Sequence, residues 1–283
     1  TPRSTSQKSR ARCCGWRAPM DAFDDDASSE DDETRPPRRA ANCGPLSFHA
    51  GTEEAMLSAA LRTRKGDAAA VLAAIDAFCF SEHWMMHVGP EKATIVRRAL
   101  RERREAVDTL ACCELGTYCG YSAIVVADEL REGDELVSVD VANYGADRLL
   151  RHAGLLQKVH LTTEPLSALF SRSRRNIDFL FIDHDKDRYL ADLRLLEPFL
   201  APGAFVVADN VLCFGDDPHM RDYLAYVRDP SGPFERSTLF PAALEYDDAP
   251  AFVKDGVEVS VCRGGAAGTL NKRRESAPKE RMS

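Results

Sequence analysis

Two apolar segments of the chain each end in residues that can bind a cation. Asp183 follows residues 177–182, and Asp209 with Asn210 follows residues 204–208. Short β-branched and aromatic segments bounded by charge are typical of strands in a parallel sheet, and such sheets bind ligands at the carboxyl ends of their strands. Mg²⁺ accepts carboxylate and amide oxygens while it keeps waters or substrate oxygens as further ligands. We therefore expect these three residues to bind Mg²⁺.

A base follows the first of these aspartates. Lys186 lies three residues after Asp183. The ammonium form of a lysine is disfavoured beside a divalent cation, which would allow Lys186 to accept a proton near neutral pH. His184 has no partner at a zinc-ligand spacing, so the pattern does not favour zinc. Two ordinary alternatives exist: the oxygen-bearing residues can cap the helices that follow, and Lys186 can be a solvated surface lysine.

A glycine-containing turn and a later aspartate indicate a second ligand. Residues 114–122 leave an expected strand through Gly116 and Gly120 and enter a helix, whose N-terminus favours negative charge. The spacing differs from the Gly-x-Gly-x-x-Gly of dinucleotide sites, and a plain turn explains it equally well. Asp140 ends the next strand about 20 residues after the glycines, where a carboxylate can accept both ribose hydroxyls of an adenosine-type cofactor. The alternative is that Asp140 caps a helix.

The remaining pattern shows how these residues are brought together. Apolar residues at helical spacing predict helices over residues 53–61, 68–79 and 91–104. Strands are then expected at 109–114, 135–140, 158–162, 177–182 and 204–208, alternating with helices at 121–130, 146–153, 166–171, 188–200 and 218–227. This alternation predicts a doubly wound α/β sheet. Strands at 234–240 and 257–262 have no helix between them, so we expect the last strand to be antiparallel.

Composition divides the chain into a core and two tails. Residues 21–33 carry eight acids and no base, and residues 264–283 are rich in glycine and alanine and then basic. Such segments cannot bury enough apolar surface to offset their ordering entropy. We expect disordered tails at 1–45 and 264–283 around a catalytic domain at 46–263. The chain without its first 40 and last 20 residues carries 24 bases against 35 acids, a poor match to nucleic acid.

Apolar stretches and cysteines allow a prediction of the cellular compartment. No apolar stretch reaches the roughly 20 residues that span a bilayer, so we expect no membrane segment. The nine cysteines are an odd number without Cys-x-x-Cys spacing. Cys112, Cys113 and Cys262 fall in expected strands, which favours a reducing compartment. We expect a cytoplasmic protein, and a transit peptide in the basic, Ser-rich residues 1–20 is the alternative.

With these residues named, the chain resembles the catechol O-methyltransferases, a family of Mg²⁺-dependent enzymes that use S-adenosyl-L-methionine. The resemblance spans roughly residues 51–263. The matching motifs stand in the family's order at residues 71–76, 84–89, 114–122, 183–190, 208–211 and 244–246. The resemblance implies a Rossmann-like class I methyltransferase fold: an α/β protein whose seven-stranded, mostly parallel sheet has one antiparallel strand and helices on both faces.

The resemblance also implies a role for each matching residue. The metal ligands would be Asp183, Asp209 and Asn210, the general base would be Lys186, and Glu245 would hydrogen-bond the second catechol hydroxyl. S-adenosyl-L-methionine would contact Val88, Glu114, Gly116, Tyr118, Tyr121, Ser122, Asp140, Val141, Asp183 and His184. The substrate would contact Trp84, Met86, Asp183, Lys186, Asn210, Phe214 and Glu245. Without the resemblance, a tryptophan and methionines at positions 84–86 are more often core side chains than a binding site.

Three features depart from the family. Asp185 stands where the animal enzymes have an aromatic residue against the adenine, Phe214 replaces a proline of the pocket wall, and residues 164–167 replace an expected Ser-Gln pair. These departures concern the adenine contacts and the substrate pocket. The metal ligands and the base are retained.

The expected reaction is an in-line transfer of the S-adenosyl-L-methionine methyl group to one hydroxyl of a Mg²⁺-chelated catechol, whose proton Lys186 takes. Positioning and electrostatics would supply most of the acceleration. Two alternatives stay open: a Mg²⁺-dependent O-methyltransferase of another vicinal diphenol, such as a phenylpropanoid ester, and a catalytically silent methyltransferase-fold protein that binds a partner. We expect a monomer that acts on a small-molecule catechol and binds neither nucleic acid nor membrane.

Overall fold

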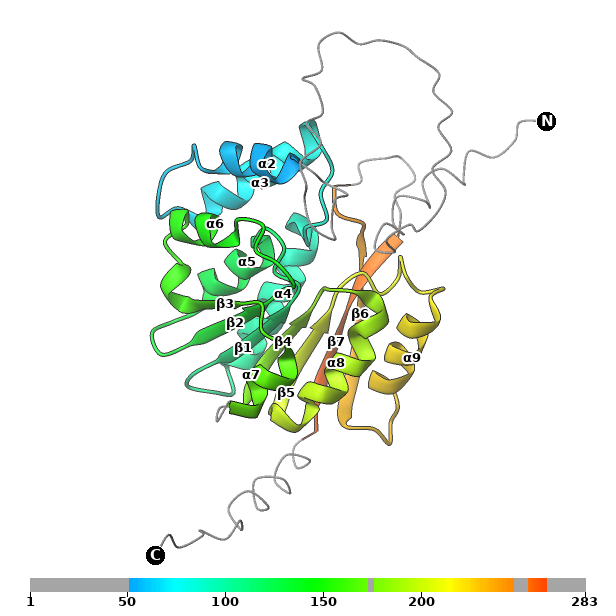
Figure 1. Cartoon of the computed structure of the whole chain (residues 1–283). Coiled ribbons are helices and arrows are strands. Elements are labelled where there is room, and N and C mark those ends of the chain that lie inside the picture. The colour runs from blue at the N-terminus through cyan, green and yellow to red at the C-terminus, as the bar shows by residue number, and fades with distance from the viewer. Residues whose placement is uncertain (1–50, 173–175, 247–253, 264–283) are drawn as a thin grey trace, which may run out of the picture.

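The computed structural model describes residues 51–172, 176–246 and 254–263 (Figure 1). Both expected tails therefore lie outside the described residues. The helices are α2 (Thr52–Ala60), α3 (Ala68–Ser81), α4 (Gly89–Arg104), α5 (Tyr121–Glu129), α6 (Ala146–His152), α7 (Leu166–Arg172), α8 (Tyr189–Leu196) and α9 (Pro218–Val227), with 3₁₀ turns η2 (Leu156–Lys158), η3 (Lys186–Arg188) and η4 (Glu197–Phe199). The strands are β1 (Ala111–Leu115), β2 (Glu135–Val139), β3 (Val159–Thr162), β4 (Ile177–Ile182), β5 (Leu200–Ala208), β6 (Phe234–Ala243) and β7 (Lys254–Cys262).

The strands of the described residues form one seven-stranded sheet in the order β3-β2-β1-β4-β5-β7-β6. Strands β1 to β5 are parallel, whereas β7 runs antiparallel to both β5 and β6. The predicted α/β architecture with one antiparallel strand is thereby confirmed. The strand order reverses between β1 and β4, and in doubly wound sheets ligands bind beyond the carboxyl ends of the strands at such a reversal.

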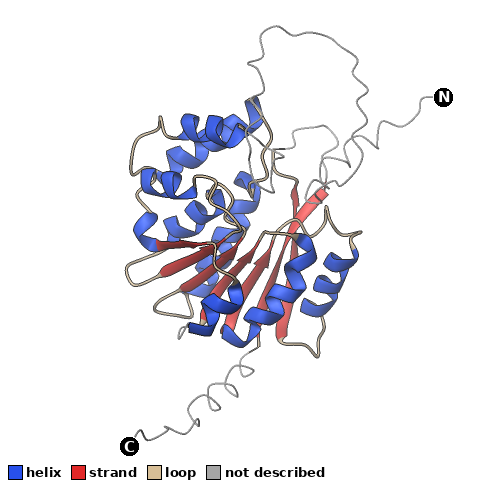
Figure 2. Cartoon of the chain, viewed as in Figure 1, coloured by secondary structure: helices blue, strands red, loops and turns tan. Residues whose placement is uncertain are grey.

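Helices cover both faces of this sheet (Figures 1 and 2). On one face α4, α5 and α6 share a core with the sheet, and α2 and α3 add to it at the carboxyl edge. On the other face α7, α8 and α9 enclose a second core. Because both faces are covered, β1 and β4 are apolar almost throughout rather than alternating, which is why their sequences show no period of two.

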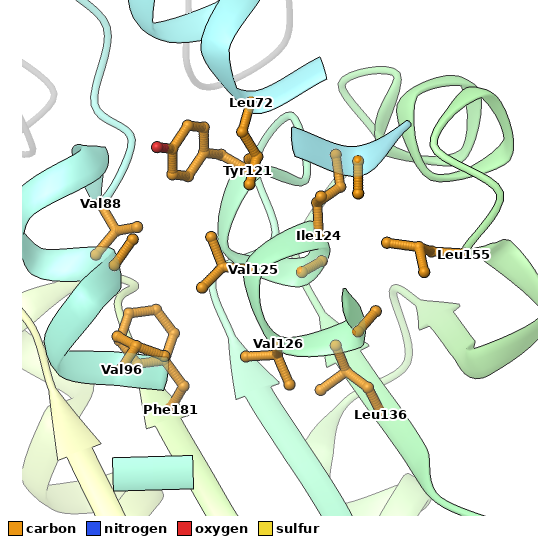
Figure 3. Close-up of a cluster of buried hydrophobic side chains, with 14 of the residues drawn as sticks. Leu72, Val88, Val96, Tyr121, Ile124, Val125, Val126, Leu136, Leu155 and Phe181 are labelled. Carbon is orange, nitrogen blue, oxygen red and sulfur yellow. The ribbon is translucent and has the colours of Figure 1, made fainter. Parts of the chain in front are cut away.

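The first core is built around α5 (Figure 3). Helix α5 is buried from Tyr121 to Ala127, because the sheet covers one side of it and α3 and α4 cover others. Val125 and Val126 lie between Val96 of α4 and Leu136 of β2 in the close-up. The glycine turn that precedes α5 is therefore attached to one of the most buried helices of the molecule.

Two element boundaries near residue 200 differ from the expectation. The helix expected over residues 188–200 ends earlier, because Pro198 cannot donate a helical hydrogen bond, and the chain continues as the 3₁₀ turn η4. Strand β5 begins at Leu200 rather than at residue 204. Its pairing with β4 shifts register between Ile177 and Phe179, and this bulge accommodates Pro202 and Gly203, two residues that are typical of turns.

The structure can also be compared with the predictions about cysteines and membrane segments. Cys112 and Cys113 of β1 and Cys262 of β7 are buried free thiols, as expected for cysteines that act as small apolar side chains. Among the residues that the structure describes, no helix combines the length and the apolar character needed to cross a bilayer.

Helix α4 crosses one face of the sheet from its carboxyl edge to its amino edge. Lys92 lies in the N-terminal part of α4, beside the carboxyl ends of the strands. The other end of the helix carries Arg103, which pairs with Asp178 at the start of β4, and Arg104, which pairs with Asp134 just before β2. One helix therefore supplies a basic group to each edge.

Candidate active site

The carboxyl ends of β1, β4 and β5 are held level by backbone hydrogen bonds. Asp183 N donates to Leu115 O at 2.8 Å, and Asp209 N donates to Ile182 O at 3.0 Å. Asn210 follows with a left-handed backbone, φ +57°, which asparagine tolerates better than most residues. The three expected metal ligands therefore come from adjacent strand ends.

Two of these side chains have an oxygen that the described residues do not fully use. Asp209 Oδ2 lies 2.9 Å from Lys92 Nζ, while Asp209 Oδ1 is buried without a hydrogen-bond partner among the described residues. Asn210 donates its Nδ2 to Asp255 Oδ2 at 2.9 Å, which leaves its amide oxygen for another contact. A buried carboxylate oxygen without a donor is costly unless a ligand satisfies it. The donor set fits a hard cation such as Mg²⁺.

Lys186 is buried at the same place. Its ammonium donates to Asp183 Oδ1 at 3.0 Å and to the Tyr189 hydroxyl at 2.7 Å, and that hydroxyl donates to Asp209 O at 3.2 Å. Lys186 is only 3% exposed, so the alternative of a solvated surface lysine is wrong. The ring of Phe214 lies 5.6 Å from its nitrogen.

Helix capping does not explain the oxygen-bearing residues at the strand ends. The side chain of Asp185 caps η3, and the side chain of Asp217 caps α9. Asp183, Asp209 and Asn210 precede these caps and do not cap the elements that follow.

A buried cluster of one lysine and three carboxylates adjoins these residues. Lys92 Nζ lies 2.9 Å from Asp209 Oδ2, 2.7 Å from Glu245 Oε2 and 2.8 Å from Asp255 Oδ2. All four side chains are nearly inaccessible to solvent. Gly89 makes this approach possible, because a Cβ on it would lie 2.8 Å from the Cβ of Glu245 and its φ is +69°.

The charges of this cluster shift one another's pKa values. Burial opposes the ammonium of Lys92, but the carboxylates of Asp209, Glu245 and Asp255 outweigh it and hold the pKa of Lys92 well above its usual value. Burial raises the pKa of Asp209 and of Glu245, only partly offset by Lys92. For Asp255 burial is outweighed by Lys92, the Gly256 N–H and Asn210, and its pKa is lowered. Lys92 is therefore a charged lysine under strong electrostatic constraint.

The glycine turn touches the metal-ligand end of β4 directly. Gly116 has φ +101°, and a Cβ on it would lie 2.0 Å from the carbonyl oxygen of Asp183, so no other residue fits there. Tyr118 also has a left-handed backbone, φ +45°, and its hydroxyl donates to Glu53 of α2 at 3.1 Å. The turn is thus held between α2 and the end of β4.

Glu114 lies fully buried at the end of β1, just before this turn. It accepts a hydrogen bond from Ser138 through Oε2, while Oε1 has no partner within the described part of the chain. Burial raises the pKa of Glu114 to about 7, although hydrogen bonds from Ser122 and Ser138 act in the other direction. A buried acid with one unused oxygen fits a ligand that carries a positive group, such as the amino group of a methionine.

Asp140 ties the glycine turn to the end of β2. Its Oδ2 accepts from Tyr118 N at 2.7 Å and its Oδ1 from Val141 N at 2.6 Å. The N-cap of α6 is Gly145, and the side-chain acceptor at this end of the helix is Asn143, whose Oδ1 accepts from Gly145 N and Ala146 N. The alternative that Asp140 caps the following helix is therefore wrong.

The other residues expected near the cofactor lie around the same edge. His184 Nε2 donates to Asp192 Oδ2 at 2.9 Å, the ring stacks on Tyr189 at 5.4 Å, and its buried Nδ1 has no partner among the described residues. Val141 is 74% exposed, and Asp185 is also exposed. Neither side chain belongs to a core of the described residues.

The segment before α4 forms another wall. Trp84 donates its indole N–H to Glu245 O at 2.8 Å and is partly buried, as is Met86, whereas Met85 is fully buried in the core. Val88 is buried and immediately precedes α4. Trp84 and Met86 also pack against the first core, and Trp84 in addition contacts the backbone of Glu245.

Comparison with known proteins shows the family of the chain. A family model described as a methyltransferase domain matches residues 113–211. The catechol O-methyltransferase of Bos taurus is 38% identical over 209 residues, which cover 70% of this chain and 72% of that protein. The enzyme of the same name from Mus musculus is 37% identical over 211 residues, which cover 71% and 74%. The chain belongs to the catechol O-methyltransferase family. It is accordingly an O-methyltransferase of the class that depends on S-adenosyl-L-methionine.

Solved structures show the same fold. The O-methyltransferase TomG from Streptomyces achromogenes, in complex with SAM, has a TM-score of 0.57 and 20% identity over 73% of this chain and 94% of that chain. An O-methyltransferase from Bacillus cereus, in complex with SAH, has a TM-score of 0.56 and 20% identity over 77% and 95%. These likenesses support the class I methyltransferase architecture derived from the strand order.

Three buried residues of the site were not predicted from the sequence: Lys92, Tyr189 and Asp255. Lys92 had a detectable signal, because a lysine in the first turns of a helix is disfavoured by the helix dipole and so needs a reason to be there. Tyr189 lies within the matching motif at residues 183–190, but its contact with Lys186 depends on how η3 turns. Asp255 had no signal, since its place depends on which strand β7 joins.

Proposed function

We propose that this enzyme transfers the methyl group of S-adenosyl-L-methionine to one hydroxyl of a catechol held by Mg²⁺. The observation that supports it best is the gathering of Asp183, Asp209 and Asn210 at neighbouring strand ends with the buried Lys186 3.0 Å from Asp183. Bound Mg²⁺ would make a chelated hydroxyl more acidic, and the cofactor would supply the methyl group.

Lys186 is the proposed proton acceptor. Its Nζ is fixed by Asp183 Oδ1 and the Tyr189 hydroxyl, so the position at which a proton would be taken is set before substrate arrives. Tyr189 is itself anchored to the backbone of Asp209. A pre-positioned base of this kind needs no rearrangement during the reaction.

The acceptor ring would lie between the residues that border Lys186 and Glu245. Glu245 uses Oε2 for Lys92, and its other oxygen would accept a hydrogen bond from the second hydroxyl. Trp84 fixes the Glu245 backbone through its indole N–H and would line the ring with Met86 and Phe214. The pocket would therefore select a ring with two adjacent hydroxyls.

The cofactor would occupy the edge formed by β1, β2 and the glycine turn. Glu114 would bind the amino group of its methionine part, and the backbone around Gly116 would allow close approach. Tyr118, Tyr121, Ser122 and Val88 would complete that end, while Asp140, Val141 and His184 would hold the ribose and adenine. All of these residues come from one chain, so we propose a monomer as the working unit.

A substrate panel tests the proposal. The full chain would be incubated with methyl-labelled S-adenosyl-L-methionine and either catechol, a phenylpropanoid ester with two adjacent hydroxyls, or a monophenol of the same ring size. We expect labelled product from the catechol with Mg²⁺, none with EDTA, and recovery when Mg²⁺ is added back.

The outcomes separate the alternatives. Faster methylation of the phenylpropanoid ester would assign the enzyme to another diphenol. Labelling of the monophenol at the same rate, or full activity after exhaustive chelation, would refute the chelated-catechol reading.

A further inference from the structure

Lys92 holds a position that neither metal binding nor proton transfer explains. It lies on α4, yet its nitrogen contacts oxygens from three other segments: Asp209 at the end of β5, Glu245 after β6 and Asp255 at the start of β7. The three distances span only 2.7 to 2.9 Å. The ammonium of Lys92 offsets the repulsion that three buried carboxylates would otherwise exert on one another.

The cluster divides the oxygens of the proposed ligands. One oxygen of Asp209 and one of Glu245 are committed to Lys92. The second oxygen of Asp209 is buried and has no hydrogen-bond partner in the part of the chain described. Each of these acids can therefore present only one oxygen to a ligand.

Asp255 completes the arrangement. Its Oδ2 accepts from both Lys92 at 2.8 Å and Asn210 Nδ2 at 2.9 Å, and its Oδ1 accepts from Cys213 N at 3.3 Å. Because the amide nitrogen of Asn210 is bound to Asp255, the amide oxygen of Asn210 is left for the metal. Asp255 thus orients Asn210 in the way that Lys92 orients Asp209.

We propose that Lys92 is a built-in counter-cation and positioning residue, which takes one oxygen each from Asp209 and Glu245 and so fixes the oxygen that each presents to metal and substrate. This inference rests on the proposed function. Lys92 acts on the substrate through Glu245, and it also lowers the negative charge that a divalent cation meets at Asp209. Removing the ammonium should therefore have opposite effects on the two ligands.

The main test is Lys92→Met, which keeps the length of the side chain and removes the charge. Mn²⁺ binding, measured by electron paramagnetic resonance without substrate, should tighten by about tenfold, because a repelling charge a few ångströms away is gone. The KM for catechol should rise by at least about tenfold, because Glu245 is no longer held. The affinity for S-adenosyl-L-methionine should stay within about twofold, since the cofactor residues lie elsewhere.

The matched control is Arg103→Met on the same helix. Arg103 is a buried base paired with Asp178 at the other edge of the sheet, so its loss removes an ion pair without touching the site. It should lower thermal stability and leave the Mn²⁺ affinity and the KM unchanged.

Asp255→Asn covers the case in which Lys92→Met does not fold. With one carboxylate fewer, Lys92 is less neutralised, and Mn²⁺ binding should weaken by several-fold. Weaker or unchanged Mn²⁺ binding in Lys92→Met, or unchanged binding in Asp255→Asn, would overturn the proposal and leave Lys92 a purely structural ion. Absence of catechol turnover by the wild type would refute the proposed function alone, because the Mn²⁺ measurements do not need it.

Discussion

The two ends of α4 both carry buried basic groups, but the carboxylates that they meet are bonded differently. At the amino edge of the sheet, Arg104 reaches both oxygens of Asp134, which also accept from Leu110 N at 2.7 Å and Arg131 N at 2.6 Å. Asp178 is divided in the same way between a side chain of α4 and the backbone N–H of β1. Every carboxylate oxygen of these two pairs has a donor.

At the carboxyl edge the donors do not cover every oxygen. Lys92 is shared by three acids, of which Asp255 also accepts from Asn210 and Cys213. Asp209 Oδ1 and Glu114 Oε1 have no hydrogen-bond partner among the described residues. A buried oxygen without a donor destabilises the fold, and it persists where a ligand supplies what the protein lacks. The comparison separates acids whose oxygens all have donors from acids that we propose serve the reaction.

The largest effect on turnover should come from Asp209, whose Oδ1 has no hydrogen-bond partner among the described residues. Asp209→Ala should lower turnover on catechol by several kcal/mol of barrier, roughly 10⁴-fold, because the proposed metal loses a ligand and its charge stabilisation. Turnover at saturating Mg²⁺ measures this, with Asp178→Ala as the control at the opposite edge. Comparable losses in turnover for the two variants would remove the distinction between the edges.

Lys186→Ala should lower kcat by about 10²- to 10⁴-fold, the range for a positioned proton acceptor, while Mn²⁺ and cofactor binding stay nearly intact. Part of the loss should return at higher pH, where the catechol ionises without help. Lys158→Ala is the matched control, because Lys158 donates to backbone carbonyl groups among the described residues, those of Ala127 and Leu130, at the far end of α5. Wild-type turnover in Lys186→Ala would exclude Lys186 from the mechanism.

The amino edge should respond in stability instead. Asp134→Ala leaves Arg104 and two backbone N–H groups without their acceptor and should cost about 3–5 kcal/mol in the free energy of unfolding. The KM for catechol of the folded fraction should not change. Glu54→Ala, which breaks an exposed pair with Arg148, should cost at most about 1 kcal/mol. Denaturant unfolding measures both, and equal losses would show that burial of the pair is not decisive.

The raised pKa of Glu114 predicts that fold stability and cofactor affinity depend on pH. Its pKa is raised by burial from 4.5 to about 7, so the ligand-free fold favours the protonated acid. The stability that this group provides is complete at low pH and is lost, by up to about 3 kcal/mol, as pH rises toward 7. A cationic amino group needs the ionised acid, so cofactor affinity should rise up to tenfold per pH unit below 7 and level off above it.

Calorimetric titration of S-adenosyl-L-methionine between pH 5.5 and 8 checks this dependence, because this interval of about 2.5 pH units includes the raised pKa of Glu114. Glu114→Gln should bind more weakly at pH 8 and show a flat profile. An unchanged slope in Glu114→Gln would assign the pH dependence to another group.

The smallest effect should come from the ends of the chain. We propose that residues 46–263 form the whole catalytic unit, so removal of residues 1–45 and 264–283 should leave kcat and KM within about twofold. A fall in kcat in a shortened chain with unchanged unfolding behaviour would show that one of these segments contributes to the reaction.

The sequence predicted the fold well because its strands are buried on both faces. Runs such as residues 177–182 can hardly be anything but strands in a covered parallel sheet, and charged residues immediately after them mark the carboxyl edge. Asp183, Asp209 and Asn210 could be placed together for the same reason. Their positions depend only on where a strand ends, which local sequence reveals.

The counter-charge at Lys92 could not be placed in this way. Its partners Glu245 and Asp255 are more than 150 residues away in sequence, and they meet Lys92 only because β7 enters the sheet next to β5. The start of β5 was also missed, since Pro202 and Gly203 resemble a turn until the bulge is seen. Contacts set by long-range strand order leave no periodic trace in sequence.

The position of β7 in the sheet has a consequence for folding during synthesis on the ribosome. Among the described strands β7 comes last in the sequence, yet it lies inside the sheet between β5 and β6 and carries Asp255. Until the ribosome has made residue 262, β5 has an open edge beside Asp209, and unpaired edges of this kind invite aggregation. A chain that ends before β7 therefore lacks Asp255 and is inactive. Its open β5 edge is also a surface that chaperones and proteases can recognise. Cellular quality control would remove the same molecules that cannot methylate anything.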